Sequence, residues 1–204
     1  MFEDKADVID DVRTAIFDAA VELFARRGYF ATTVRDIVEK AGVTQPMVYY
    51  YFGSKEQLFI TCIKELHAVE TKKFKSVDPT LPFAEFMSKF MAVCVEAFQE
   101  RPEGFMMLIH LAHSRDEYPQ FPEMGEIISQ PLHITKEAII QAKKRGEVKS
   151  NVQEEAFGIA LFGALEMAAS MIYISHTFKM PFDVTPHNFA KEVMEMLLYG
   201  VMKK

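Results

Sequence analysis

Apolar residues recur every three or four positions along most of this chain, which is the pattern of helices that bury one side. Glycine and proline interrupt the pattern at intervals, and signals for β-strands are nearly absent. We therefore predict an all-α protein with about nine helices. Outside the segment with the strongest motif, the expected helices span residues 11–27, 55–73, 83–99, 103–114 and 125–145, with two more capped by Asn151 (paired with Glu154) and by Thr185.

The segment from Thr33 to Phe59 contains two short helices joined by a glycine turn. Thr33 is expected to cap the first helix together with Asp36, three residues on. Gly42 ends that helix, because glycine adopts a left-handed conformation without strain. Thr44 is expected to cap the second helix. This order predicts a helix-turn-helix, in which the second helix enters the DNA major groove by its N-terminal end.

Three pieces of this region, AAVELFARRGYFATTVRDI, AGVT and VYYYFGSKEQLF, resemble the DNA-binding domain of the tetracycline-repressor (TetR) family. The resemblance covers residues 16–59 and implies a dimeric transcriptional regulator, usually a repressor, that a small molecule releases from a palindromic operator. The chain departs from the family pattern at Val38, Tyr51 and Gly53, where alanine, histidine and a cation are common. The departure at Gly53 is expected to remove one phosphate contact.

The expected domain boundary lies at the start of the helix that follows the motif. We assign residues 1–54 to a three-helix DNA-binding domain and residues 55–204 to an all-helical domain for effector binding and dimerisation. A single recognition helix cannot specify a genomic site. Two copies related by a twofold axis are therefore expected to read the two half-sites of double-stranded operator DNA.

The side chains best placed to reach base edges are those in the first turn of the second short helix, Thr44, Gln45, Pro46 and Met47. Gln45 is the main candidate for specific recognition, because its amide can pair with N7 and N6 of adenine. The alternative for Gln45 is a solvated residue at a helix start. Pro46 and Met47 offer apolar surface that suits a thymine methyl group.

A second group of residues is expected to hold the DNA backbone. By the resemblance, Tyr49 and Tyr50 contact sugar and phosphate through their hydroxyl groups, whereas Tyr51 either does the same or packs inside. Lys55, at the start of the following helix, is expected to bind phosphate through its charge. Thr33 either contacts phosphate as well or serves only as a helix cap.

The 204-residue chain has a net charge of −6 at pH 7, which opposes binding to phosphate. Residues 25–55 are more favourable, with five cations against two acids. The acidic residues among the first eleven argue against a basic arm in the minor groove, and this stretch lacks the apolar core of a signal peptide. Cys62 and Cys94 lie in apolar surroundings typical of buried, reduced thiols. We therefore expect a cytoplasmic protein.

Residues 156–174 form the most hydrophobic stretch, with Glu166 as its only charge. A membrane-spanning helix is the alternative, but the central glutamate and the lack of a basic flank argue against it. We expect this helix to pair with the last helix in a four-helix homodimer interface, as the TetR family usually does, and we expect no membrane partner. Small residues that would allow close approach lie along one side: Ala156, Ala160, Gly163, Ala164 and Ala168.

The other helices are rich in methionine and phenylalanine, of which the chain has 13 and 18. Such side chains adapt to varied apolar ligands, although ordinary core filling explains any single one of them. An apolar cavity with a few polar groups would suit a small hydrophobic or aromatic effector. The candidate lining residues are Phe86, Phe90, Met107, His110, Glu166, Met167 and Tyr173.

Two alternatives to a ligand-controlled regulator were weighed. His110 and His113 lie one helical turn apart, with Asp116 and Glu117 just beyond, an arrangement that could hold a metal ion. Two histidines at this spacing are weak evidence, and the HExxH pattern is absent, so we expect no enzyme, no metal and no cofactor. The second alternative is a dimer that has lost operator binding, and the intact DNA-contact residues argue against it.

Overall fold

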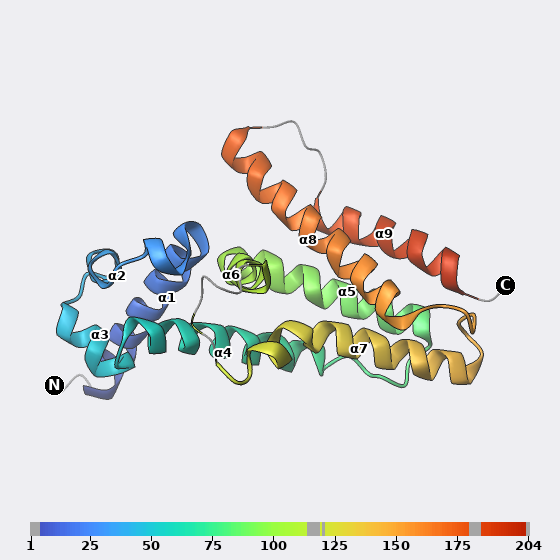
Figure 1. Cartoon of the computed structure of the whole chain (residues 1–204), viewed down its shortest axis with the longest axis horizontal. Coiled ribbons are helices and arrows are strands. Elements are labelled where there is room, and N and C mark those ends of the chain that lie inside the picture. The colour runs from blue at the N-terminus through green and yellow to red at the C-terminus, as the bar shows by residue number, and fades with distance from the viewer. Residues whose placement is uncertain (1–4, 114–118, 120, 180–184, 203–204) are drawn as a thin grey trace. The chain divides into compact units, whose positions relative to one another are not determined.

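The structure of the chain, a computed structural model, describes residues 5–113, 119, 121–179 and 185–202 (Figure 1). Of these, the side chains of residues 5–10, 112–113, 172–178 and 186–187 lie outside the description. The described backbone is helical apart from turns, loops and one isolated bridge between Val148 and Met202. The all-α prediction is confirmed.

The described residues form nine helices. They are α1 (Lys5–Ala31), α2 (Val34–Ala41), α3 (Gln45–Phe52), α4 (Lys55–Phe74), α5 (Phe83–Glu100), α6 (Pro102–His113), α7 (Met124–Arg145), α8 (Glu154–Phe178) and α9 (Pro186–Val201). The largest difference from the predicted bounds is in α1, which begins earlier and continues after Gly28. Gly28 does break the helical backbone, with φ 76° and ψ 171°, and one further turn then runs to Ala31.

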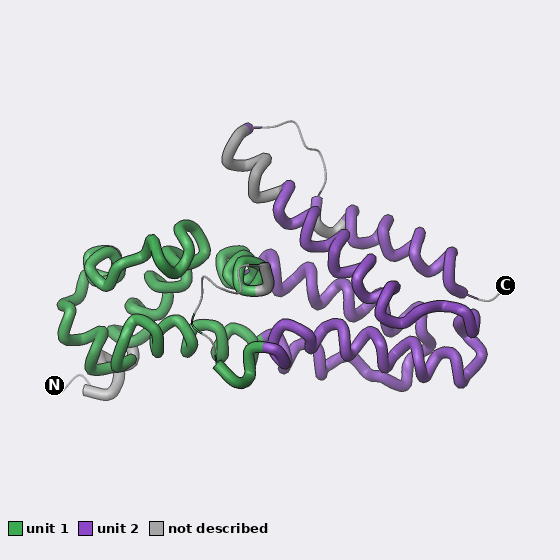
Figure 2. Tube along the Cα trace, in the orientation of Figure 1, with its two compact units in different colours: residues 1–69, 101–124 green, residues 70–100, 125–204 purple. Residues whose placement is uncertain are grey.

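The chain divides into two compact units, shown in different colours in Figure 2. The first comprises residues 1–69 and 101–124, and the second comprises residues 70–100 and 125–204. Helix α4 therefore contributes residues to both units, and α6 belongs to the first unit although it follows α5 in sequence. The expected boundary after residue 54 separates a DNA-binding domain from a domain for effector binding and dimerisation. This functional division stays a prediction.

The first unit has an apolar core that supports its two shortest helices. Ile16, Ala20 and Phe24 of α1 are completely buried, as the spacing of apolar residues predicted. The Phe24 ring meets Phe59 of α4 edge to face, with centroids 5.2 Å apart. Helices α2 and α6 both pack on α1. Helix α1 is thus the support against which the helix-turn-helix is held.

The second unit has a core built largely from phenylalanine and methionine side chains of α5, packed with apolar residues of α7, α8 and α9. Helix α9 packs along both α5 and α8 (Figure 1). A polar contact also joins α5 to the end of α7, because the N–H of Phe83 donates to Glu147 Oε2 at 2.6 Å. The fully buried members of this core include Phe83, Met87, Phe90, Ile139 and Leu161.

Helix α8 begins at Glu154, so the prediction that Asn151 caps this helix was wrong. Lys143 of α7 donates to the Val152 carbonyl and to Glu154 Oε1, both at 2.5 Å. These contacts from another helix hold the connection before α8 and engage the carboxylate that the capping pattern requires. At α9 the prediction is confirmed, since the Thr185 hydroxyl accepts the Asn188 N–H at 3.3 Å.

The hydrophobic length of α8 raised the question of a membrane span. Among the residues that the structure describes, no helix combines the length and the apolarity needed to cross a bilayer.

Candidate nucleic-acid interface

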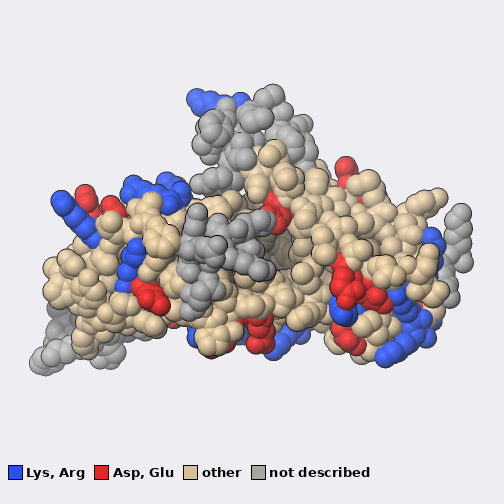
Figure 3. All heavy atoms as spheres, in the orientation of Figure 1, with Lys and Arg blue, Asp and Glu red and all other residues tan. Residues whose placement is uncertain are grey.

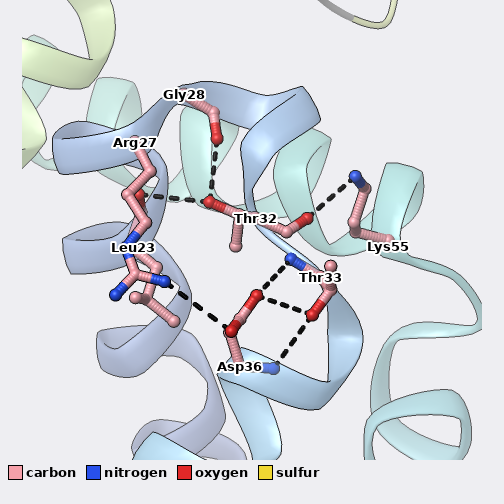
Figure 4. A network of polar contacts seen from close by, with 7 residues as sticks. All are labelled: Leu23, Arg27, Gly28, Thr32, Thr33, Asp36 and Lys55. Atoms are coloured by element: carbon pink, nitrogen blue, oxygen red, sulfur yellow. Dashed lines mark hydrogen bonds and ion pairs between the residues drawn. The ribbon is translucent and has the colours of Figure 1, made fainter.

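Helix α2 begins with the predicted capping box, drawn in Figure 4. The Asp36 N–H donates to Thr33 Oγ1 at 3.1 Å, and Asp36 Oδ2 accepts the Thr33 N–H at 2.8 Å. The Thr33 hydroxyl also donates to Asp36 Oδ2, at 2.6 Å. The hydroxyl and backbone donors of Thr33 lower the pKa of the Asp36 carboxyl, since they stabilise its charged form.

The junction between α1 and α2 is fixed by a buried threonine that the sequence analysis missed. Thr32 is completely buried, and its hydroxyl lies 2.8 Å from the Gly28 carbonyl oxygen and 3.2 Å from that of Leu23 (Figure 4). Its position four residues after the glycine that breaks α1 was the available signal. The hydroxyl thereby ties Thr32 to the backbone of α1 on either side of its break.

The turn between α2 and α3 has the predicted geometry. Gly42 is left-handed, with φ 68° and ψ 28°, and its N–H donates to the Val38 carbonyl. Thr44 then occupies the N-cap position of α3 in an extended conformation, but its hydroxyl makes no capping hydrogen bond. The Thr44 side chain is exposed. The Thr44 hydroxyl therefore does not cap α3.

Helix α3 has one buried face and one exposed face. Val48 and Phe52 are buried, at 0% and 7% exposure, and anchor the helix to the rest of the unit. Tyr51 is half-buried, and its ring contacts Tyr50 edge to face at 5.0 Å. The exposed face consists of predicted DNA-contact residues, namely Gln45, Pro46, Met47, Tyr49 and Tyr50.

Two of these exposed residues are connected to each other. Gln45 Nε2 donates to the Tyr49 hydroxyl oxygen at 3.2 Å, across one helical turn. The predicted base-reading amide and the predicted backbone-binding hydroxyl thus form one hydrogen-bonded pair. The exposed fraction of Tyr50, 79%, is much larger than that of Tyr49, 46%. Tyr50 therefore presents the larger aromatic surface to a partner.

Lys55, the first residue of α4, turns its ammonium group onto the backbone of the α1–α2 junction. Its Nζ donates to the carbonyl oxygens of Tyr29 and Thr32 at 2.9 and 3.0 Å, and it lies 4.0 Å from the centre of the Tyr29 ring. The pKa of the Lys55 ammonium is lowered by burial. The structure thus gives Lys55 protein partners that the sequence analysis did not foresee.

Arg13 and Glu65 are a second pair of contacts that the sequence analysis missed. Arg13 of α1 forms an ion pair with Glu65 of α4, and its guanidinium carbon lies 5.4 Å from the centre of the Phe52 ring. Phe52 is the last residue of α3. Arg13 of α1 therefore contacts both the C-terminal end of α3 and α4. No local sequence pattern signals such a contact, because Arg13 and Glu65 are far apart along the chain.

Several cations of the helix-turn-helix region are paired with acids. Glu22 pairs with Lys40 at 2.8 Å and with Arg26 at 3.5 Å, and Asp36 pairs with Arg27 at 3.6 Å. The Lys40 contact is the main cause that lowers the pKa of Glu22. On the face drawn in Figure 3, basic side chains of the first unit accordingly lie beside acidic ones. DNA phosphates would therefore compete with carboxylates for these cations.

The residues predicted to line an effector cavity fall in different environments. In the second unit, the Phe86 and Phe90 rings are buried and stacked, with centroids 6.0 Å apart, whereas Met167 on α8 is 59% exposed. Glu166 is half-buried. In the first unit, Met107 is buried and His110 half-buried. The side chain of the seventh candidate, Tyr173, lies outside the described residues.

Helices α8 and α9 carry an exposed apolar stripe, which we call the α8–α9 stripe. On α8 its large members are Ile159, 63% exposed, and Met167, and on α9 they are Met196, 67% exposed, and Tyr199, 81% exposed. Exposed small residues of α8 accompany the large ones, namely Ala156, Ala160 and Gly163. An exposed apolar surface of this kind marks an interaction site.

The alternative metal site gains no support from the described part of the chain. Among the side chains that the structure describes, no three His, Cys, Asp or Glu residues lie close enough together to hold a metal ion. Of the cluster considered from the sequence, Asp116, Glu117 and the His113 side chain lie outside that part. Cys62 and Cys94 are buried free thiols, and burial raises the pKa of both.

Comparisons with known proteins agree with this geometry. Residues 16–62 match the family described as bacterial regulatory proteins, tetR family. An uncharacterized HTH-type transcriptional regulator of Bacillus subtilis, YdgC, is 27% identical over 94% of this chain and 93% of its own length. The fatty acid metabolism regulator protein of the same organism is 23% identical, over 93% of this chain and 95% of its own.

The fold is also found among solved structures. The fatty acid degradation regulator FadR from Bacillus halodurans superposes with a TM-score of 0.71 at 20% identity, covering 91% of this chain and 94% of that one. The similar proteins are transcriptional regulators and not enzymes, as expected for this chain. Together with the exposed face of α3 on a capped helix-turn-helix, these similarities identify residues 16–62 as a DNA-binding domain of the TetR family and support a transcriptional regulator of that family.

Proposed function

We propose that the protein represses transcription by binding a palindromic operator as a homodimer, and that a small hydrophobic effector releases it. The observation that carries this proposal is the composition of α3. Every side chain at its N-terminal end that suits base or phosphate contact is exposed, while Val48 and Phe52 anchor the opposite face. Such a helix can enter a major groove without rearrangement of its support.

The proposed contacts divide into base and backbone contacts. Thr44, Gln45, Pro46 and Met47 face base edges, with Gln45 reading an adenine. Its bond to Tyr49 holds the amide in one orientation before DNA arrives, which lowers the entropy lost on binding. Tyr49, Tyr50, Tyr51 and Thr33 are the proposed contacts to sugar and phosphate.

The α8–α9 stripe is the proposed dimer interface. Its four large side chains lie on two helices that pack together, and small residues between them allow a second helix to approach closely. A twofold axis through such a surface pairs it with itself, which closes the assembly at two copies. Met167 takes a role in this interface in place of the cavity role expected from the sequence. Operator binding also implies that the protein works in the cytoplasm.

The effector is proposed to be a molecule with a long apolar chain. The phenylalanine- and methionine-rich core of the second unit suits such a ligand, and Phe86 and Phe90 remain its proposed contacts. One relative is named a fatty acid metabolism regulator, so a fatty acid derivative is the first candidate. Release requires the effector to bind more tightly to a conformation that binds DNA poorly.

Selection of bound sequences from a random DNA pool tests the proposal. We expect a near-palindrome, bound by two copies of the chain. Gln45→Ala should lower the preference for the selected sequence by about 1–3 kcal/mol at one position of each half-site. Gln57→Ala, which changes an exposed glutamine on α4, is the matched control and should leave the preference unchanged.

Addition of fatty acids and their thioesters to the selected complex then tests release. We expect at least one of them to dissociate the complex at a concentration that leaves the protein folded. A selected pool without any common sequence would refute operator binding. A complex that every such ligand leaves intact would refute only the proposed effector class.

A further inference from the structure

Lys55 links two parts of the first unit that are separate in sequence. It is the first residue of α4, and its ammonium group binds the carbonyl oxygens of Tyr29 and Thr32, which lie 26 and 23 positions earlier. The side chain is half-buried, and its Nζ lies over the Tyr29 ring, 4.0 Å from the ring centre. Figure 4 shows the ammonium directed at the Thr32 carbonyl oxygen, beside the capping box.

Both carbonyl groups accept a hydrogen bond from a charged donor, Lys55 Nζ. They lie where α1 ends, and the last carbonyls of a helix lack partners within it. The Tyr29 carbonyl also accepts the Thr32 N–H, in a long bond of 3.4 Å. A cation at a helix C-terminus also complements the helix dipole. Moving the ammonium to a DNA phosphate would therefore leave these carbonyls without their charged donor.

The residues that Lys55 holds lead directly into the DNA-reading segment. Thr32 precedes Thr33, the cap of α2, and the Thr32 hydroxyl is itself bound to Gly28 and Leu23. The start of α4 and the start of α2 are thereby connected through one side chain. A change in this connection would alter the angle at which α2, and α3 after it, meets the DNA.

We infer that Lys55 is a positioning residue that braces the helix-turn-helix from within, in place of the phosphate contact expected from its charge. The inference rests on the proposed operator binding for its effect on DNA, but the brace itself exists without DNA. These two roles differ in measurable ways. A phosphate contact acts only in the complex and contributes to its salt dependence, whereas a brace acts in the free protein.

The first measurement is amide hydrogen exchange of the full-length, DNA-free protein. Lys55→Met should speed exchange in residues 31–37, because the start of α2 loses its connection to α4. Lys72→Met removes an exposed lysine from the last turn of the same helix and is the matched control. It should leave exchange in residues 31–37 unchanged. Unchanged exchange in Lys55→Met would overturn the inference.

The second measurement is affinity for the selected operator, and for DNA of unrelated sequence, across a series of salt concentrations. Lys55→Met should weaken operator binding about tenfold and leave binding to unrelated DNA nearly unchanged, since charge contacts dominate the latter. The slope of log affinity against log salt should match that of the original protein. A slope shallower by about one per protomer would identify Lys55 as a phosphate contact and overturn the brace.

The ratio of the affinity for the operator to the affinity for unrelated DNA separates a positioning effect from a general loss of stability. Partial unfolding lowers both affinities equally and leaves their ratio unchanged. If Lys55→Met does not fold, Lys55→Gln, which keeps one amide donor, is scored by the same measurements. If the original protein selects no DNA, the proposed function fails, and the exchange measurement still decides whether the brace exists.

Discussion

The α1–α2 junction of the first unit and the core of the second unit are stabilised by different kinds of contact. The α1–α2 junction, which leads into the helix-turn-helix, is fixed by polar bonds between Thr33 and Asp36, Thr32 and Gly28, and Lys55 and Tyr29. In the second unit, the core consists of phenylalanine, methionine and aliphatic side chains in contact. Hydrogen bonds specify direction, whereas apolar packing specifies mainly volume.

This difference suits the two tasks proposed for the units. A base-reading helix must meet the groove at one angle, and directional bonds at its supports define that angle. A cavity for apolar effectors must accept molecules of differing shape, and methionine and phenylalanine adapt to them at small energetic cost. The comparison predicts that substitutions in the second unit change mainly stability, while substitutions at the α1–α2 junction change mainly recognition.

The largest effect is expected in the second unit. Phe90 is completely buried and contacts the rings of Phe74, Phe86 and Phe162. Phe90→Ala should lower the free energy of unfolding by about 3–5 kcal/mol, because it leaves a cavity among these rings. Urea denaturation followed by circular dichroism measures the change. Phe90→Leu keeps most of the side-chain volume and should lower the free energy of unfolding by less than about 2 kcal/mol. Equal losses of stability in both variants would contradict the view that packing at Phe90 stabilises the second unit.

A medium effect separates two threonines at equivalent helix positions. Thr33 and Thr44 are both N-caps, but only the Thr33 hydroxyl makes a capping bond. Thr33→Ala should lower the free energy of unfolding by about 1 kcal/mol, and Thr44→Ala by no more than a few tenths. Thermal denaturation of the two variants checks the difference. Equal effects of the two substitutions on stability would argue that the Thr33 capping bond does not stabilise the first unit.

The smallest expected effect is on acid stability. The pKa of Asp36 is lowered in the folded protein by its bonds from Thr33, so its contribution to stability is complete above the ordinary value of about 3.9. The contribution is lost as the pH falls through the lowered pKa. Denaturation between about pH 5 and about pH 2 should therefore show a shallower loss of stability for Asp36→Asn than for the original protein. A parallel loss in both would argue against the capping bonds in solution.

Local patterns in the sequence predicted the parts of the fold that depend on neighbouring residues. The Thr33–Asp36 cap, the left-handed Gly42 and the Thr185 cap each involve residues within four positions, and all three are present. The Asn151 cap was wrong because Lys143, from another helix, holds Val152 and Glu154. A capping pattern cannot show such competition from a distant side chain.

The partners of Lys55 and Arg13 could not be predicted for the same reason. Helical periodicity identifies the buried face of each helix but not which helices meet, so contacts such as Lys55 with Tyr29 or Arg13 with Glu65 are invisible to it. The exposed residues of α3 were predictable because a short helix with two anchors, Val48 and Phe52, leaves the rest outside. The predicted effector residues were less constrained, since every apolar helix of the second unit offered similar candidates.

Gly28 is half-buried, but its backbone angles restrict substitution at this position more than its burial does. With φ 76° and ψ 171°, it occupies a region that is essentially closed to residues with a Cβ atom, at a cost of about 1–3 kcal/mol. Its carbonyl oxygen is also the acceptor for the buried Thr32 hydroxyl. In the evolution of this protein, position 28 should therefore tolerate change as little as the interior does, although no ligand and no nucleotide need ever touch it.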